Sequence, residues 1–252
     1  MICNQRTKRS FASIRLISPP LRPRGVYLRL VGVLLAAGAL AASAQAEEPF
    51  QPCANTADGI TLERRAVPGS KFYEYRATTV ATATPDVVLR SIWNGNTEQL
   101  PATVKQRTVL STSDATMVFY DQIKTKVVSD RDYTLRFTWQ RNAQTGVIEV
   151  PFATANELGP PPAPGHVRVP IIRGDWIIAP LGAQAANSAT PAAASGESAT
   201  ATATRITYLC YSEPGGSIPA FMARGAQQDQ VLLDIRRIRE RAQHPAPKTA
   251  AR

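Results

Sequence analysis

Short runs rich in Val, Ile, Thr and aromatic residues recur along most of the chain and predict strands. The connections between these runs are mostly short, which favours antiparallel pairing. The predicted strands are Ile60–Val67, Phe72–Ala81, Val104–Leu110, Thr116–Val128, Asp132–Arg141, Val147–Phe152, Val167–Arg173, Trp176–Leu181 and Arg205–Ser212.

Two segments have a helical pattern instead. Thr84 is a suitable N-cap, Pro85 fits the first helical position and Asp86 favours the first turn, so a helix is expected to begin there. The second predicted helix runs from Ile218 to Arg241. Its apolar spacing places five residues on one face: Ile218, Met222, Gly225, Leu232 and Ile235. Phe221 and Ile238 lie at the edge of this face.

A long antiparallel sheet closed by one C-terminal helix cannot fill its interior with helix alone. The pattern therefore predicts an α+β domain with space for a cavity between sheet and helix. In the strand after Asp132, alternation places Tyr133, Leu135, Phe137 and Trp139 on one face, and this apolar face is expected to line the interior.

The excess of positive charge is concentrated in the first 46 residues. The chain has 29 Lys and Arg against 19 Asp and Glu, a formal net charge of +10. Seven of the basic residues and none of the acids precede residue 47, so residues 47–252 carry 22 basic and 19 acidic groups, a net charge of +3. This small excess gives no basic face for phosphates, and we expect no nucleic-acid partner.

The basic segment leads into a short apolar run that ends in Ala44-Gln45-Ala46, a pattern typical of a secretory signal peptide. We expect residues 1–46 to be removed and the protein to be periplasmic or secreted. An uncleaved membrane anchor is the main alternative.

Composition divides the remainder into a single domain with flexible additions. Residues 47–57 form a mature N-terminal segment, the domain spans about residues 58–242, and residues 243–252 form a disordered tail. Residues 182–204 are almost wholly small or polar and predict a low-complexity insertion, because they lack the large apolar side chains that offset ordering entropy. Cys53 and Cys210 remain after cleavage, either as a disulfide or as two unpaired thiols.

Few residues suggest catalysis. The chain has two histidines, His166 and His244, and no His-Cys cluster, so neither a metal site nor a cofactor is expected. No nucleophile elbow or Gly-rich phosphate loop is present. The arginines at positions 236, 237, 239 and 241 are expected to complement the negative end of their own helix, and contact with anionic lipid is the alternative.

Three local signatures, in this order, resemble a known family. Asp130-Arg131-Asp132-Tyr133 opens a strand, and Val167-Arg168-Val169 precedes Trp176-Ile177-Ile178-Ala179-Pro180. Arg205-Ile206-Thr207-Tyr208 then leads through Glu213-Pro214-Gly215-Gly216-Ser217-Ile218-Pro219 into the final helix. Over residues 59–242 the chain is similar to the START (StAR-related lipid-transfer) domain of the Bet v 1-like helix-grip superfamily.

This resemblance implies a curved antiparallel sheet wrapped around the last helix and enclosing one lipid or other hydrophobic small molecule, for transfer or sensing and without catalysis. The expected cavity residues are Tyr133, Leu135, Phe137, Trp139, Met222, Gly225 and Leu232. Several sterol-binding relatives have a buried Arg where this chain has Phe137, which suggests a more apolar cavity. We expect a monomer that makes transient membrane contact.

Two other functions remain open from the sequence. One is an enzyme of the same superfamily, such as a polyketide cyclase or aromatase, which would need inward-facing Arg, His or acidic side chains. The other is a periplasmic interaction protein whose cavity has collapsed and which holds no ligand.

Overall fold

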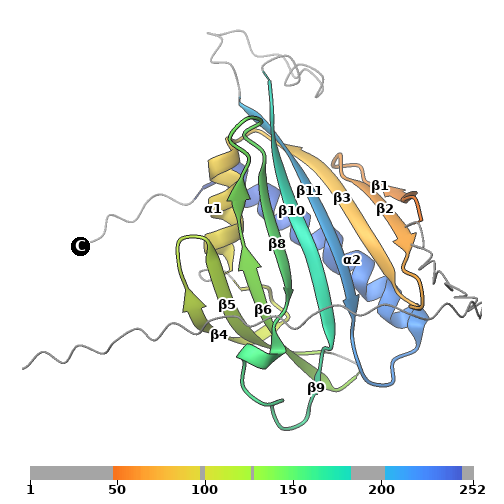
Figure 1. Cartoon of the computed structure of the whole chain (residues 1–252). Coiled ribbons are helices and arrows are strands. Elements are labelled where there is room, and N and C mark those ends of the chain that lie inside the picture. Colours follow the sequence, from red (N-terminus) through yellow and green to blue (C-terminus); the bar gives the residue numbers. More distant parts are fainter. Residues whose placement is uncertain (1–47, 97–99, 126–127, 183–201, 246–252) are drawn as a thin grey trace, which may run out of the picture. The chain divides into compact units, whose positions relative to one another are not determined.

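The strands form one large curved sheet that passes over a long C-terminal helix (Figure 1). The computed structural model describes residues 48–96, 100–125, 128–182 and 202–245, which all lie in the second of two units, residues 45–252. Within the described residues the sheet has 11 strands in the order β1-β2-β3-β11-β10-β8-β6-β5-β4, with β7 beside β8 and β9 beside β6. The predicted α+β helix-grip fold is confirmed.

Neighbouring strands run antiparallel except β6 and β9, which pair in parallel. The predicted antiparallel arrangement is thus correct for the main path of the sheet. The strands are β1 (Gln51–Asn55), β2 (Thr61–Ala66), β3 (Tyr73–Ala81), β4 (Val104–Thr112), β5 (Thr116–Ile123), β6 (Asp130–Thr138), β7 (Gln140–Arg141), β8 (Ile148–Thr154), β9 (His166–Arg168), β10 (Ile171–Leu181) and β11 (Ala203–Glu213).

Both predicted helices are present. Helix α1 (Pro85–Gly95) begins as expected, with the Thr84 side chain accepting a hydrogen bond from the Val87 amide. Helix α2 (Ala220–Gln243) is the last element and packs on β3, β11 and α1, and a short 3-10 turn, η1 (Asn156–Leu158), follows β8. The two helices therefore cover the same side of the sheet, and the core lies between them and the strands (Figure 1).

Strand β10 is longer than expected. The sequence predicts a break between Val167–Arg173 and Trp176–Leu181, whereas the structure has β9 and then one continuous strand that pairs with β11 from Ile171 to Leu181. Gly174 does not mark a turn but a close approach, because a Cβ atom there would lie 2.0 Å from the Leu209 carbonyl oxygen and 2.5 Å from the Phe152 ring.

The ends of several predicted segments also differ, and the strand expected over Thr116–Val128, for example, ends at Ile123. Strand β1 lies in the segment expected only to precede the domain, and it extends the sheet by pairing with β2. Strand β11 already begins at Ala203, so Ala203 and Thr204 belong to the sheet and not to the predicted insertion. Residues 183–201, like the predicted signal peptide and most of the C-terminal tail, lie outside the described residues.

The charged motif at the start of β6 holds several segments together. Asp132 is fully buried and accepts hydrogen bonds from Arg168 Nε (2.8 Å), the Tyr120 hydroxyl (2.8 Å) and the Ala163 amide (2.6 Å). Arg131 donates to the carbonyl oxygens of Pro214 and Gly215, each at 3.4 Å. All three sequence signatures therefore meet at this motif, which fixes the segment that leads into α2.

Cys53 and Cys210 are free thiols, the second of the two alternatives left by the sequence. Both are half-buried. Burial raises the pKa of Cys210 to about 12, so this thiol stays protonated at neutral pH.

Candidate functional site

A cavity of about 270 Å³ lies between the sheet and the two helices. Strands β4, β5, β6, β8, β10 and β11 supply one wall, and α2 with the C-terminal end of α1 supplies the other. Its volume is close to the lower end of the range of about 300–1,000 Å³ typical of ligand sites. The space suits one small molecule or one chain of a larger one.

The sheet side of the cavity is aromatic. Phe119, Phe137 and Phe152 stack on three strands, with ring centroids 5.5 and 4.9 Å apart. The series continues through Tyr208, 6.0 Å from Phe152, to Trp176, which stacks on Tyr208 at 3.9 Å. All five side chains line the cavity, because inward-facing positions of adjacent strands lie side by side. This wall is suited to an apolar ligand.

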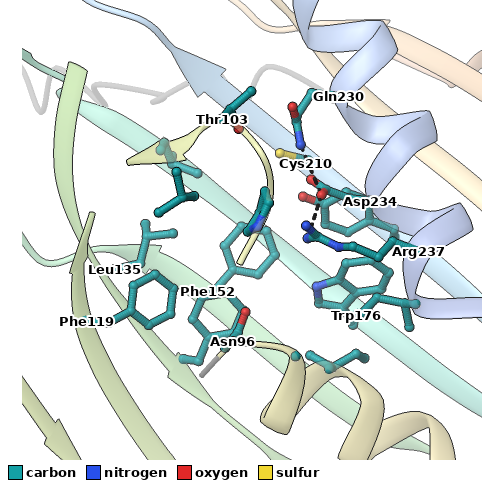
Figure 2. A pocket seen from close by; sticks show the side chains of 18 of the residues that line it. Asn96, Thr103, Phe119, Leu135, Phe152, Trp176, Cys210, Gln230, Asp234 and Arg237 are labelled. Atoms are coloured by element: carbon teal, nitrogen blue, oxygen red, sulfur yellow. Dashed lines mark hydrogen bonds and ion pairs between the residues drawn. The ribbon is translucent and has the colours of Figure 1, made fainter. Parts of the chain in front are cut away.

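The helix side of the cavity is polar (Figure 2). Asp234 accepts hydrogen bonds from Arg237 Nη2 at 2.9 Å and from Gln230 Nε2 at 3.0 Å, and Arg241 lies one turn further along α2. Burial raises the pKa of Asp234, while Arg237 and Gln230 oppose that rise. Figure 2 shows Gln230, Asp234 and Arg237 across the cavity from Phe119, Leu135 and Phe152.

A second ion pair lies at the sheet end of the polar region. Arg107 of β4 donates to both carboxylate oxygens of Asp121 on β5, to the Asn96 carbonyl oxygen, and lies 3.7 Å over the Phe119 ring. Asp121 is fully buried. Burial raises the pKa of Asp121, and the hydrogen bonds from Arg107 and Tyr133 oppose that rise. The pair therefore fixes the C-terminal end of α1 against the sheet.

The predicted strand residues are placed largely as expected. Tyr133, Leu135 and Phe137 line the cavity. Trp139 packs against the edge of the core and donates from its indole nitrogen to the Asp114 carbonyl oxygen, but it does not line the cavity. It lies one residue beyond the end of β6, where the regular alternation stops.

The predicted helix residues are mostly misplaced. Met222 is 39% exposed, and Gly225 is exposed on the outer surface of α2, so neither faces the cavity. Leu232 packs against the core but does not line the cavity. The prediction was wrong because it assigned the inward face by its apolar spacing, whereas the residues that α2 presents to the cavity are mainly polar.

This placement gives Gly225 no role in ligand binding. A Cβ atom at Gly225 would meet nothing within 4 Å, and glycine costs about 1 kcal/mol relative to alanine inside a helix. The variant Gly225→Ala is expected to raise the free energy of unfolding by up to about 1 kcal/mol in urea denaturation, with unchanged ligand affinity. A loss of stability would contradict the exposed position of this residue.

The charged residues of the cavity were not predicted from the sequence, which indicated a more apolar interior. Arginines 107, 237 and 241 and Asp234 line it. A signal for the helix residues was present, since Gln230, Asp234, Arg237 and Arg241 recur at intervals of four, three and four, the spacing of one helix face. The arginines at positions 236 and 239 instead pair with Asp58, so the cluster does not act together at the helix end.

In the part of the chain that the structure describes, no group of three or more His, Cys, Asp or Glu side chains is placed to hold a metal ion. No helix in those residues is long and apolar enough to cross a membrane.

The sheet, the C-terminal helix and the cavity between them together define the START-type helix-grip fold, and solved structures agree. The chain is similar to the StAR-related lipid transfer protein from Xanthomonas axonopodis, with a TM-score of 0.62 and 22% identity over 77% of this chain and 99% of that one. For the human StarD13 lipid transfer and protein localization domain the TM-score is 0.59 and the identity 18%, over 79% of this chain and 91% of that one. For human StAR-related lipid transfer protein 5 the TM-score is 0.58 and the identity 16%, over 77% of this chain and 86% of that one.

Comparison of sequences alone finds a relative of low identity. The chain is 26% identical over 223 residues to an uncharacterized protein of Pseudomonas aeruginosa, which covers 87% of this chain and 98% of that protein. No protein-family model matches the sequence. The comparisons thus establish the fold of the chain.

Proposed function

We propose that the protein binds one hydrophobic small molecule or one lipid chain in its cavity and carries or senses it without catalysing a reaction. The observation that carries this proposal is the continuous aromatic wall of the cavity, in which five rings from five strands face a space of about 270 Å³. Apolar surface that lines a cavity favours an apolar occupant over water. The names of the three similar solved proteins, all lipid transfer proteins or domains, support the same class of ligand.

A matched pair of variants on β10 tests whether the cavity is the binding site. Ile172 lines the cavity, whereas its neighbour Ile171 is 37% exposed, because successive strand residues point to opposite faces. Ile172→Trp is expected to fill part of the space and to weaken the binding of decan-1-ol at least tenfold in calorimetric titration. Ile171→Trp is the control and is expected to bind as the wild type does. Equal binding by both variants would place the ligand elsewhere.

A second candidate function is an enzyme that holds a reactive chain, such as a polyketide cyclase or aromatase. One observation favours it: three arginines and one aspartate line the cavity, and these are side chains that such a reaction needs. The two functions differ in what becomes of the bound molecule. A carrier releases its ligand chemically unchanged, so mass spectrometry of the released molecule separates them.

We also propose that this binding takes place outside the cytoplasm, with transient contact to a membrane when the ligand is exchanged. The basic segment and apolar run before Ala44-Gln45-Ala46 support this location. N-terminal sequencing of protein recovered from the periplasm is expected to begin at Glu47. An intact leader in the membrane fraction would mean that the segment is an anchor.

A further inference from the structure

We propose that the protein docks on a membrane that contains anionic lipid, through the N-terminal end of α2 and the turn between β2 and β3. Phe221 and Met222 contact the acyl chains, and Lys71 and Arg224 contact the lipid phosphates. These four residues form the docking surface. The inference rests on the proposed function, since it gives the transient membrane contact a place on the molecule and a class of lipid.

The first argument is the exposure of apolar side chains at the start of α2. Phe221 is 74% exposed, more than any other large apolar side chain in the described residues, and its neighbour Met222 is 39% exposed. A phenylalanine left in water forgoes the free energy that its burial would supply. Exposed apolar side chains that lie together, with polar groups around them, mark a site of contact.

Packing holds this end of α2 in place, so the exposure does not come from a loose helix end. Phe72, Tyr211 and Ala223 form a small buried cluster behind it. Arg224 Nε also donates a hydrogen bond of 2.7 Å to the Lys71 carbonyl oxygen, which joins α2 to the turn between β2 and β3 (Figure 1). The docking surface is therefore preformed.

The second argument is the positive charge around these apolar side chains. Arg64 and Arg224 both lie over the Tyr73 ring, 4.6 and 4.8 Å from its centroid. The Lys71 ammonium lies 5.6 Å from the centroid of the Phe72 ring. Within the described residues none of these three cations takes part in an ion pair. Cations at the rim of an apolar patch favour a surface of anionic lipid.

The size of the patch favours a membrane over a protein partner. A stable protein interface buries about 800 Å² on each partner, whereas two apolar side chains with a few cations suit weak, reversible binding to lipid. The docking surface also lies on the helix that lines the cavity. Gln230 is the lining residue of α2 nearest to it, nine residues after Phe221 and about 14 Å along the helix axis.

The test measures co-sedimentation of the purified protein with lipid vesicles. Wild-type protein is expected to bind phosphatidylcholine vesicles with about one third phosphatidylglycerol at least tenfold more tightly than vesicles of phosphatidylcholine alone. Phe221→Ser is expected to weaken binding to the anionic vesicles at least fivefold, because it removes the exposed ring. Lys71→Gln is expected to weaken it about fivefold, because one cation near the membrane is lost.

Two variants on β4, at the opposite edge of the sheet, are matched controls. Lys105→Gln removes one exposed positive charge, as Lys71→Gln does. Val109→Ser removes an apolar side chain that is 42% exposed, as Phe221→Ser removes one on α2. Both controls are expected to bind anionic vesicles as the wild type does. All four substitutions are at exposed positions, so thermal unfolding is expected to show the wild-type fold in each variant.

Three results would overturn the inference. They are wild-type protein that binds neither kind of vesicle or binds both equally, wild-type binding by both Phe221→Ser and Lys71→Gln, and controls that lose binding as these variants do. A dimer that light scattering detects and that dissociates in Phe221→Ser would instead assign the surface to a second copy of the chain.

Calorimetry with decan-1-ol on the same proteins tests the proposed function separately. Phe221→Ser and Lys71→Gln are expected to bind the alcohol as the wild type does, because neither residue lines the cavity. Wild-type protein that binds anionic vesicles but not the alcohol would overturn the proposed ligand binding and leave the docking surface in place.

Discussion

Replacing Asp132 by alanine is expected to lower the free energy of unfolding by about 3–5 kcal/mol, measured by urea denaturation at neutral pH. Asp132 is fully buried and joins β6 to Arg168 of β9, to Tyr120 of β5 and to the Ala163 amide. The variant leaves the Arg168 charge and two other donors without their acceptor, which explains the size of the effect. A matched control is Asp86→Ala, which breaks an exposed ion pair with Arg141 and is expected to cost less than about 1 kcal/mol.

The Asp132 contribution also depends on pH. Burial raises the pKa of Asp132, but the hydrogen bonds from Arg168, Ala163 and Tyr120 outweigh this effect and hold the pKa below its usual value. Because the folded state favours the ionised form, the stabilisation is present above the unfolded pKa of about 3.9 and is lost as pH falls through the folded pKa. The difference between wild type and Asp132→Asn should therefore shrink in acid. A difference that is constant down to pH 2 would contradict the ion pair.

Replacing Arg107 by methionine is expected to cost a similar amount, about 3–5 kcal/mol at neutral pH, because it leaves the Asp121 carboxylate buried without its counter-ion. The pH dependence has the opposite sign. Burial raises the pKa of Asp121 and loss of Arg107 raises it further, so the folded variant binds a proton more readily than the unfolded chain. Its stability is expected to rise as pH falls through this raised pKa.

A double variant tests the same pair without changing pH. Arg107→Met combined with Asp121→Leu replaces the ion pair by apolar side chains and is expected to recover most of the lost stability, since no buried charge remains. A double variant as unstable as Arg107→Met alone would show that the loss comes from the contacts of Arg107 with Phe119 and Asn96 instead.

The strands were predictable because a sheet with one buried face gives a clear alternation of side chains. Tyr133, Leu135 and Phe137 follow this alternation into the cavity, and it fails only at Trp139, just past the end of β6. Local chemistry was also sufficient at the start of α1, where Thr84 and Pro85 specify the first turn.

The inward face of α2 was not predictable by the same reasoning. An apolar stripe marks the face of a helix that packs on a core, and Val231, Ile235 and Ile238 do pack there. A helix beside a cavity has a second inward face whose residues contact the ligand space, and here that face carries Asp234 and Arg237. The spacing of Gln230, Asp234, Arg237 and Arg241 shows that they share one helix face, but not that this face points inward, because that depends on the sheet opposite.

The central claim is that the cavity holds one apolar molecule, and native mass spectrometry of protein purified without detergent tests it most directly. Wild-type protein is expected to give a species heavier than the unliganded chain by the mass of a single ligand, which disappears on denaturation and is absent from Ile172→Trp but present in Ile171→Trp. A wild-type protein that carries no ligand and does not bind decan-1-ol in the same experiment would contradict it.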